Sequence, residues 1–192
     1  MMKLKYVKHL VLTVSVAAGV ALPVDAFAAV DMFLKIDTIN GESMDKAHKG
    51  EIDVLAWSWG ESAAVNTAVR SGAAAGKTCI RDLQITKYID AATPPLIAAG
   101  ATGAHLKTAV LTMRKAGESQ FEFLKLTLSN VTVSSYATAP NASDPVYGDR
   151  PLEKVTLQFD VMDGAYNRQN ADGGAGAAVT WQVYGPSSSN CP

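Results

Sequence analysis

The chain contains 192 residues, of which 48% are hydrophobic, and its formal net charge is −1 at pH 7. A chain of this length can form one domain with its own hydrophobic core, and the sequence lacks the self-similarity at roughly 20–50 residues that indicates a repeat array. Because the chain is weakly acidic and has no basic cluster, it lacks the electrostatic footprint of a nucleic-acid-binding protein.

The first predicted element is a cleavable export leader over residues 1–28. It begins with three lysines, continues with the apolar run Leu10–Leu22 and ends with Ala26-Phe27-Ala28. About 13 apolar residues are too few to span a bilayer, and small residues at the end of the run fit the pocket of a signal peptidase. The alternatives are a membrane anchor or a buried helix, and Pro23 and Asp25 directly after the run disfavour both.

Cleavage between Ala28 and Ala29 leaves one mature domain, residues 29–192. The leader carries three lysines and one aspartate, so its removal changes the formal charge from −1 to −3. The sequence therefore predicts a periplasmic or secreted protein that has no stable membrane insertion after cleavage.

Short strands separated by turns dominate the mature domain. The predicted strands are 33–36, 51–61, 80–89, 107–115, 121–128, 130–136, 152–162 and 180–184. In the strand 107–115, Ala109, Leu111 and Met113 are expected to face the core. In the strand 152–162, Val155, Leu157, Phe159 and Val161 are expected to point inward. The hydrophobic alternation shifts phase between Phe123 and Leu124, which predicts a β-bulge. Residues 167–178 are rich in Gly, Ala and Asn and are interpreted as a loop.

A short helix is predicted over Thr93–Gly103. Thr93 is a plausible N-cap, proline is tolerated in the first turn of a helix, and Gly103 can adopt the left-handed conformation that ends one. About eight strands and one short helix predict a mainly β domain, a small antiparallel barrel or sandwich with the helix on its side.

Several segments of this domain resemble the haemolysin-coregulated protein (Hcp) family, the tube protein of type VI secretion. The matching segments are 29–37, 48–60, 82–90, the short helix, 114–117, 123–126 and 133–136. Their order and spacing agree with the family over nearly all of the mature domain. Hcp proteins are small β-barrels with one helix that close into six-membered rings, and the rings stack into a tube that can carry effector proteins.

The resemblance implies a structural subunit that forms a homohexameric ring, with effector proteins and other type VI secretion components as partners. It implies no enzymatic activity and no cofactor. The leader is a departure, because family members begin near Ala29–Met32 and their tubes assemble in the cytoplasm. If the leader is not used, the chain would be cytoplasmic before type VI secretion, and Met32 could in principle be an internal start.

A polar loop matches the extended loop with which the family's rings contact each other. Its candidate ring-stacking residues are Glu42, Ser43, Asp45, Lys46, His48 and Lys49. The alternative is an ordinary solvated loop, although protruding polar loops often make contacts.

The chain has two cysteines, Cys79 and Cys191, which could form one disulfide bond in an oxidising compartment. Such a bond would close a long loop and contribute roughly 3–5 kcal/mol if unstrained. The alternative is two free thiols, because the sequence carries no information on their geometry.

No set of residues predicts catalysis or metal binding. His48 and His105 are far apart in sequence and lack carboxylates or cysteines at metal-ligand spacing, so each is expected to be a surface or satisfied polar residue. Trp57 and Trp59 could stack on sugars, but core or ring-interface packing is favoured. Two further hypotheses stay open: an exported monomeric β-domain that acts as a binding module, and, remotely, an exported hydrolase that pairs Cys79 with a histidine.

Overall fold

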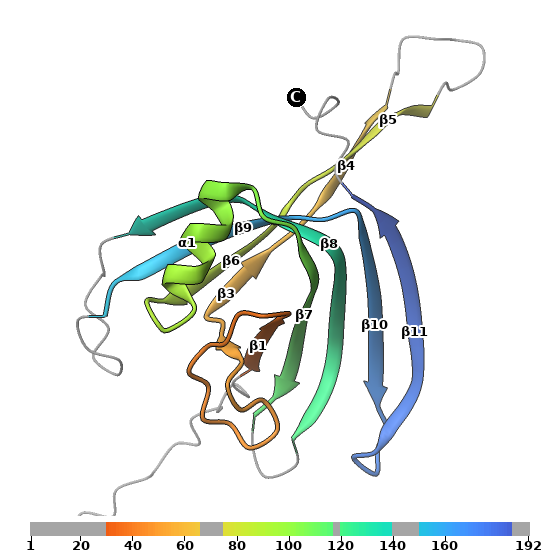
Figure 1. Ribbon diagram of the computed structural model, residues 1–192. Helices are drawn as coiled ribbons and strands as arrows, with labels where there is room; N and C mark the ends of the chain where they lie inside the picture. The colour runs from red at the N-terminus through yellow and green to blue at the C-terminus, as the bar shows by residue number, and fades with distance from the viewer. Residues whose placement is uncertain (1–29, 66–74, 117–119, 140–149, 186–192) are drawn as a thin grey trace, which may run out of the picture.

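The structure is a computed structural model that describes residues 30–65, 75–116, 120–139 and 150–185 (Figure 1). The predicted leader, its cleavage point Ala28/Ala29 and Cys191 lie outside these residues. The elements are β1 Val30–Ile36, β2 Ile52–Asp53, β3 Ala56–Ser58, β4 Glu61–Val65, β5 Ala75–Ile80, β6 Leu83–Tyr88, α1 Thr93–Thr102, β7 Leu106–Lys115, β8 Phe121–Ala139, β9 Leu152–Gln158, β10 Val161–Gln169 and β11 Ala175–Tyr184. The mainly β fold with one short helix is confirmed, with eleven strands in the described ranges instead of about eight.

Nine strands form one antiparallel sheet in the order β2-β1-β7-β8-β9-β6-β3, and β10 and β11 branch from β8. This branching is possible because β8 is 19 residues long. Its residues 124–129 pair with β10, whereas residues 132–139 pair with β9. Asn130 lies between the two pairings with a φ of 51°, in the left-handed region. The predicted strands 121–128 and 130–136 are therefore a single strand that changes partner.

The two ends of this strand order, β2 and β3, belong to one chain segment. Between them, the Val54 N–H donates to the Met32 carbonyl (2.9 Å) and the Leu55 N–H donates to the Thr86 carbonyl (2.8 Å). The segment thus passes from β1 on one side of the core to β6 on the other, although β2 and β3 do not pair with each other. The prediction of one strand over 51–61 is wrong, because a single straight strand could not pair with both β1 and β6.

The core lies inside this curved sheet. The predicted inward faces of β7 and β9 are confirmed, because Ala109, Leu111, Met113, Val155, Leu157 and Phe159 are all buried. The strand predicted over 152–162 is interrupted after Gln158, where a turn precedes β10. This turn changes the phase of the alternation, so Met162 is buried in place of Val161.

The β-bulge predicted near Phe123 is confirmed. Met113 of β7 is paired with Leu124, but the next residue, Arg114, is paired with Glu122. Phe123 is therefore the extra residue of β8, and the bulge bends the strand. The predicted strand 80–89 is also divided, since Ile80 ends β5 and Leu83 begins β6.

Helix α1 covers one side of the sheet and packs on β8 (Figure 1). Its N-cap is Ala92 and not Thr93, whose hydroxyl instead donates to the buried Glu153 carboxylate (3.0 Å). The prediction of a left-handed end is confirmed, because Gly103 has a φ of 63°. A side chain at Gly100 would crowd Val133, with the added Cβ only 3.3 Å from Cγ1, so glycine lets the helix lie close to the sheet.

Two hairpins extend from this body. In the first, β10 and β11 pair from Val161↔Tyr184 to Gln169↔Ala175, so the prediction of a loop over 167–178 is wrong. Gly and Ala are typical of loops, but main-chain pairing does not require larger side chains. In the second hairpin, β4 and β5 form a separate two-stranded sheet that projects away from the helix and the main sheet (Figure 1).

Candidate assembly surfaces

The loop of residues 42–49 is held against the body by a buried ion pair. Arg114 lies on β7, and its side chain is 4% exposed. Its guanidinium donates to both carboxylate oxygens of Asp45, at 2.6 and 3.1 Å, and to Asp31 at 2.9 Å. The hydrogen bond from Arg114 holds the pKa of Asp45 far below its ordinary value, and the same bond is the main cause of a raised pKa for Arg114. Asp45 is therefore an anchor of the loop.

His48 is the second anchor of the 42–49 loop. Its ring stacks on Phe33 of β1 with a centroid separation of 4.1 Å and an interplanar angle of 8°. Its Nδ1 lies 2.9 Å from a Glu51 carboxylate oxygen, and its Nε2 lies 3.4 Å from Glu122. His48 is thus buried, and its Nδ1 has a hydrogen-bond partner, whereas its Nε2 makes no hydrogen bond within the described chain. The prediction of a surface or fully satisfied residue is therefore met only in part.

Main-chain bonds close the loop. The Ser43 N–H donates to the Glu51 carbonyl, and the Gly50 N–H donates back to the Ser43 carbonyl, both at 2.9 Å. Gly41 is needed for this closure, because a Cβ at that position would overlap the Glu51 carbonyl. Gly50 is also required, since its φ of 76° strains any residue with a side chain.

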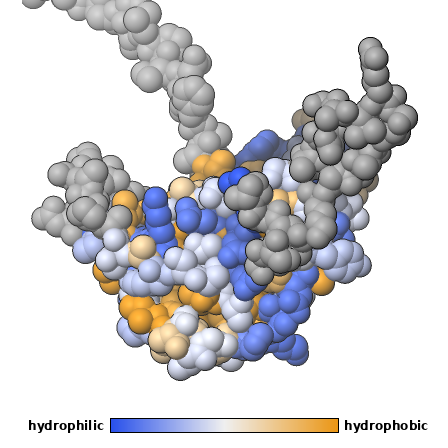
Figure 2. Space-filling view, turned by 90° about the horizontal axis from the view of Figure 1, so that it is seen from above, coloured by the Kyte–Doolittle hydropathy of each residue, from blue (hydrophilic) through white to orange (hydrophobic). Residues whose placement is uncertain are grey.

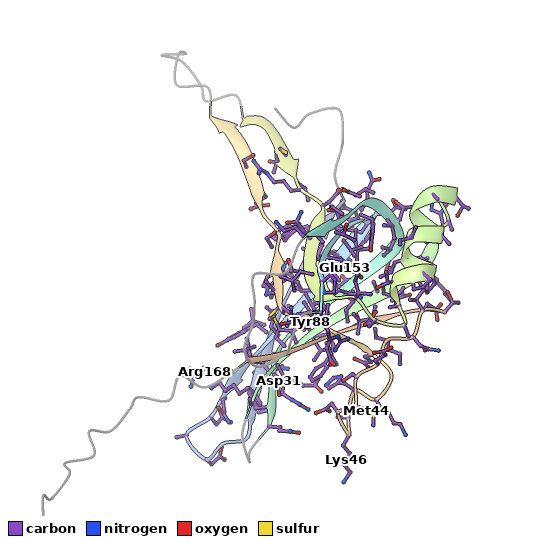
Figure 3. The ribbon with its side chains drawn as sticks, turned by 90° about the vertical axis from the view of Figure 1, so that its left-hand side faces the viewer. Asp31, Met44, Lys46, Tyr88, Glu153 and Arg168 are labelled. Atoms are coloured by element: carbon purple, nitrogen blue, oxygen red, sulfur yellow. The ribbon has the colours of Figure 1, made fainter. Side chains whose placement is uncertain are left out.

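The six predicted stacking residues therefore divide into two groups. Ser43 and His48 are buried and Asp45 is half-buried, so these three hold the loop. Glu42, Lys46 and Lys49 are exposed and available for contacts. The sequence analysis missed Met44, which at 86% is the most exposed large hydrophobic residue of the described chain. Figure 3 shows Met44 and Lys46 at the outer end of the loop, away from Glu153.

A hollow of about 550 Å³ lies beside this loop. Met44, Val30 and Leu55 give it an exposed apolar rim, and Glu42 and Arg150 add a pair of opposite charges. Glu42 also accepts a hydrogen bond from the Ala91 N–H (3.1 Å), which ties the loop to the start of α1. The loop and the hollow together form one surface with apolar and charged contact groups.

Strand β11 is a second surface that the sequence analysis missed. Within the described residues it pairs with β10 alone, so its outer edge has no partner strand. None of its ten residues is charged, and Val179, Trp181 and Tyr184 are 63%, 37% and 68% exposed. Soluble proteins normally protect such an edge with charges, proline or a covering segment. An uncharged and exposed edge of this length is typical of a strand that pairs with another chain.

Trp181 has a specific place on this surface. It is paired with Gly164 on β10, and its indole lies against the glycine so closely that a Cβ there would overlap the ring. On its other side, Gly164 is paired with Leu126 of β8, which belongs to the core. Trp181, Gly164 and Leu126 therefore lie side by side across three strands. The apolar interior thus extends outward along β10 and β11 to the exposed edge.

Helix α1 adds a third exposed apolar feature. Its sequence contains no charged residue, and Ile97 is 44% exposed. Surface helices usually carry charged residues on their solvent face. The view from above shows hydrophobic residues, drawn orange, between hydrophilic ones on the described surface (Figure 2).

A buried polar cluster holds α1 and its neighbours in place. The Lys87 ammonium is fully buried and lies 2.6 Å from both Glu153 and Asp90. The Tyr136 hydroxyl donates to Glu153 at 2.8 Å, and burial together with this carboxylate raises the pKa of Tyr136 to about 12. Because the hydroxyl stays protonated, it serves as a fixed donor. Each carboxylate and hydroxyl is satisfied inside the fold, so the cluster has a structural role.

The remaining candidate residues form no common site. Trp57 and Trp59 pack against the hydrophobic core, as the favoured alternative predicted. His105 lies at the surface with its Nδ1 3.0 Å from the Asn130 side-chain oxygen. Cys79 is buried and takes part in a disulfide bond. A search of the described residues finds no cluster of three or more metal-ligating side chains, and no described helix is long and apolar enough to cross a membrane.

Comparison with known proteins decides the family. The profile of the family described as "Type VI secretion system effector, Hcp" matches residues 33–166, more than two thirds of the chain. The chain belongs to the Hcp family. Protein hcp1 of Pseudomonas aeruginosa strain PAO1 is 49% identical over 146 residues, which cover 76% of this chain and 88% of that protein.

Solved structures agree with this assignment. The crystal structure of Hcp1 from Salmonella typhimurium is 32% identical with a TM-score of 0.63, covering 82% of this chain and 95% of that one. A type six secretion system protein is 28% identical with a TM-score of 0.73, covering 85% and 99%. A type VI secretion system effector from Yersinia pestis is 30% identical with a TM-score of 0.63, covering 80% and 99%. These matches confirm the prediction that this chain is an Hcp-like tube protein of type VI secretion.

Proposed function

We propose that this chain is an exported Hcp-like ring subunit: copies of residues 29–192 close into a homohexamer after the leader is removed. The observation that carries the proposal is the uncharged outer edge of β11 in a member of this family. Its main-chain donors and acceptors and its exposed apolar side chains need a partner strand. A head-to-tail contact between identical copies satisfies every such edge when the ring closes.

The 42–49 loop supports the stacking of such rings. The ion pair of Asp45 with Arg114 and the buried His48 fix its shape within the subunit, which lowers the cost of ordering the loop when it binds. Its exposed groups, Met44, Lys46 and Lys49, can then meet the next ring with one apolar and two basic side chains. The proposal gives this loop the role of the family's extended loop.

The leader supports export as the first step. Strand β1 begins at Val30, directly after the proposed cleavage between Ala28 and Ala29, so processing would leave the domain whole. The mature protein would act in the periplasm or outside the cell. As in the family that it resembles, its partners would be effector proteins carried in the lumen and other type VI secretion components.

Native mass spectrometry tests the proposal on mature protein recovered from fractions of cells that express the full chain. We expect an N-terminal Ala29 and a single species of six copies. The variant Val179→Lys places a charge on the edge of β11 and should leave monomers with unchanged circular dichroism. Ser135→Lys, at an exposed position of β8 outside the surfaces described above, is the matched control and should still form rings.

Two outcomes would contradict the proposal. A wild-type monomer that begins at Ala29, even at high concentration, would favour the alternative of an exported binding module. Rings that retain Met1 in the cytoplasm would remove the export step and leave a cytoplasmic tube subunit.

A further inference from the structure

His48 is a buried imidazole with a carboxylate beside each of its two ring nitrogens. The side chain is 7% exposed, its Nδ1 lies 2.9 Å from a Glu51 oxygen, and its Nε2 lies 3.4 Å from a Glu122 oxygen. Glu51 directly precedes β2, whereas Glu122 lies on β8. The ring also stacks on Phe33 of β1. Through this one side chain, the 42–49 loop contacts both β1 and β8 of the main sheet.

A neutral imidazole satisfies only one of the two carboxylates. It carries a single N–H, and an ionised carboxylate accepts hydrogen bonds but donates none. With its N–H at Nδ1, the His48 ring donates to Glu51, and Nε2 then presents a lone pair to the Glu122 carboxylate. In agreement with this, Nε2 is buried and has no hydrogen-bond partner among the described residues. A proton at Nε2 would replace this repulsive contact with an ion pair.

Arg114 of β7 contacts the same Phe33 ring as His48, but its charge is already neutralised. Its guanidinium lies 4.9 Å from the centroid of the Phe33 ring. It forms ion pairs with Asp31 of β1 at 2.9 Å and with Asp45 of the loop at 2.6 Å. The main-chain N–H of His48 also donates to Asp45, at 3.2 Å. Two carboxylates therefore offset the one positive charge on this side of the ring.

Lys125 of β8 is the other cation of this cluster. Its Nζ lies 3.4 Å from Glu122, but the two side chains are 48% and 39% exposed, so water and salt screen the pair. Lys46 and Lys49 of the loop are exposed as well. Two cations and four carboxylates make ion pairs around a neutral His48, and their charges sum to −2: Arg114, Lys125, Asp31, Asp45, Glu51 and Glu122. An imidazolium reduces this excess of negative charge.

The main chain connects His48 to the rest of the loop. The Glu51 N–H donates to the His48 carbonyl at 3.0 Å, and the Gly50 N–H donates to the Ser43 carbonyl at 2.9 Å. These bonds close the segment that carries the exposed Met44. A change in the contact between His48 and β8 therefore acts on the segment that presents the contact groups of the loop.

We propose that His48 is a pH switch for the 42–49 loop: the charged imidazole fastens the loop to Glu122 on β8, and the neutral imidazole releases this contact. Histidine is the side chain whose charge ordinarily changes between about pH 5 and 8. Because the ion pair exists only in the folded loop, its stabilisation is present at acidic pH, where His48 is charged, and is lost as the pH rises. The consequence for assembly rests on the proposed function: ring stacking through this loop is stronger at acidic pH.

Hydrogen exchange measured by mass spectrometry tests the switch on the mature protein at about pH 5.5 and about pH 8, near the two ends of the histidine range. After correction for the intrinsic effect of pH on exchange, we expect residues 42–51 to be at least about fivefold better protected at acidic pH, the effect of one net hydrogen bond. In Glu122→Gln, a neutral amide faces Nε2 and can donate to its lone pair. The loop of this variant should be protected equally at both pH values.

Two controls separate His48 from other groups. Glu42→Gln makes the same substitution at an exposed position of the loop and should keep the wild-type pH dependence. His105→Asn removes the other histidine of the described residues, which lies at the surface beside Asn130, and should keep it too.

Equal protection of the wild-type loop at both pH values would refute the switch, and so would an unchanged pH dependence in Glu122→Gln. Sedimentation velocity at the same two pH values tests the consequence for assembly. Stacking that strengthens at acidic pH in the wild type but not in Glu122→Gln supports it, whereas rings that stack equally at both pH values would refute the link to stacking. A pH-dependent loop in a protein that stays monomeric would contradict the ring proposal and leave the switch intact.

Discussion

The 42–49 loop and strand β11 both present exposed side chains, but the fold holds them in opposite ways. The loop is fixed from inside, by the Asp45–Arg114 ion pair, the stack of His48 on Phe33 and main-chain bonds. Strand β11 is bonded on one side only and leaves its outer edge without a described partner. The difference teaches that one of these two exposed surfaces is fixed by the fold itself, whereas the other has an edge without a partner among the described residues, which we propose another chain completes.

The largest effect on the loop is expected from Arg114→Met. The substitution leaves the partly buried carboxylates of Asp45 and Asp31 without their cation. We expect the free energy of unfolding to fall by about 3–5 kcal/mol, the usual cost of breaking a buried ion pair, as measured by denaturant titration.

Arg150→Met is the control for this prediction. Arg150 lies 3.8 Å from Glu42, and both side chains are at least half exposed, at 50% and 56%. Exposed pairs contribute at most about 1 kcal/mol, so this variant should unfold close to the wild type. Equal losses in both variants would show that the loop is not held by its buried anchor.

A smaller effect is expected on the edge strand from Gly164→Ala. The added methyl group overlaps the Trp181 indole, so the ring must move away from β10. We expect a loss of about 1–3 kcal/mol in unfolding free energy, typical of overpacking. The double variant Gly164→Ala/Trp181→Ala should lose less than the sum of the two single variants, because the overlap is gone. Strict additivity would mean that the cross-strand contact is unimportant.

The smallest effect on stability is expected from Lys46→Ala combined with Met44→Ser. Both side chains are exposed and neither anchors the loop, so the free energy of unfolding should change by less than about 0.5 kcal/mol. Rings should still close, but their association into stacks should weaken, which sedimentation velocity can measure. Unchanged stacking would indicate that this loop is an ordinary solvated loop.

Much of the fold could be predicted from local patterns. Strict alternation identified the buried faces of β7 and β9, the phase shift at Phe123 identified the bulge, and Gly103 marked the end of the helix. Each of these features depends on neighbours along the chain, because side chains alternate along a strand and a left-handed φ favours glycine.

The candidate site could be predicted only in part. The polar 42–49 loop was identified as a unit, but its sequence does not distinguish the buried anchors Ser43 and His48 from the exposed Lys46 and Lys49. The partners that hold the loop lie on other segments: Phe33 of β1 stacks on His48, and Arg114 of β7 binds Asp45. The small residues of β10 and β11 were interpreted as a loop because composition does not record which strand lies alongside.

By itself, the sequence determined the class of the fold, the short helix, the bulge and the family resemblance, because hydrophobic period and turn chemistry act over a few residues. Only the tertiary structure decided that the segment 52–58 joins both ends of the sheet order, that β8 changes partner at Asn130, and that β11 has an uncharged edge with no partner among the described strands. These outcomes depend on pairing between distant segments, where main-chain hydrogen bonds form with little regard to side-chain identity.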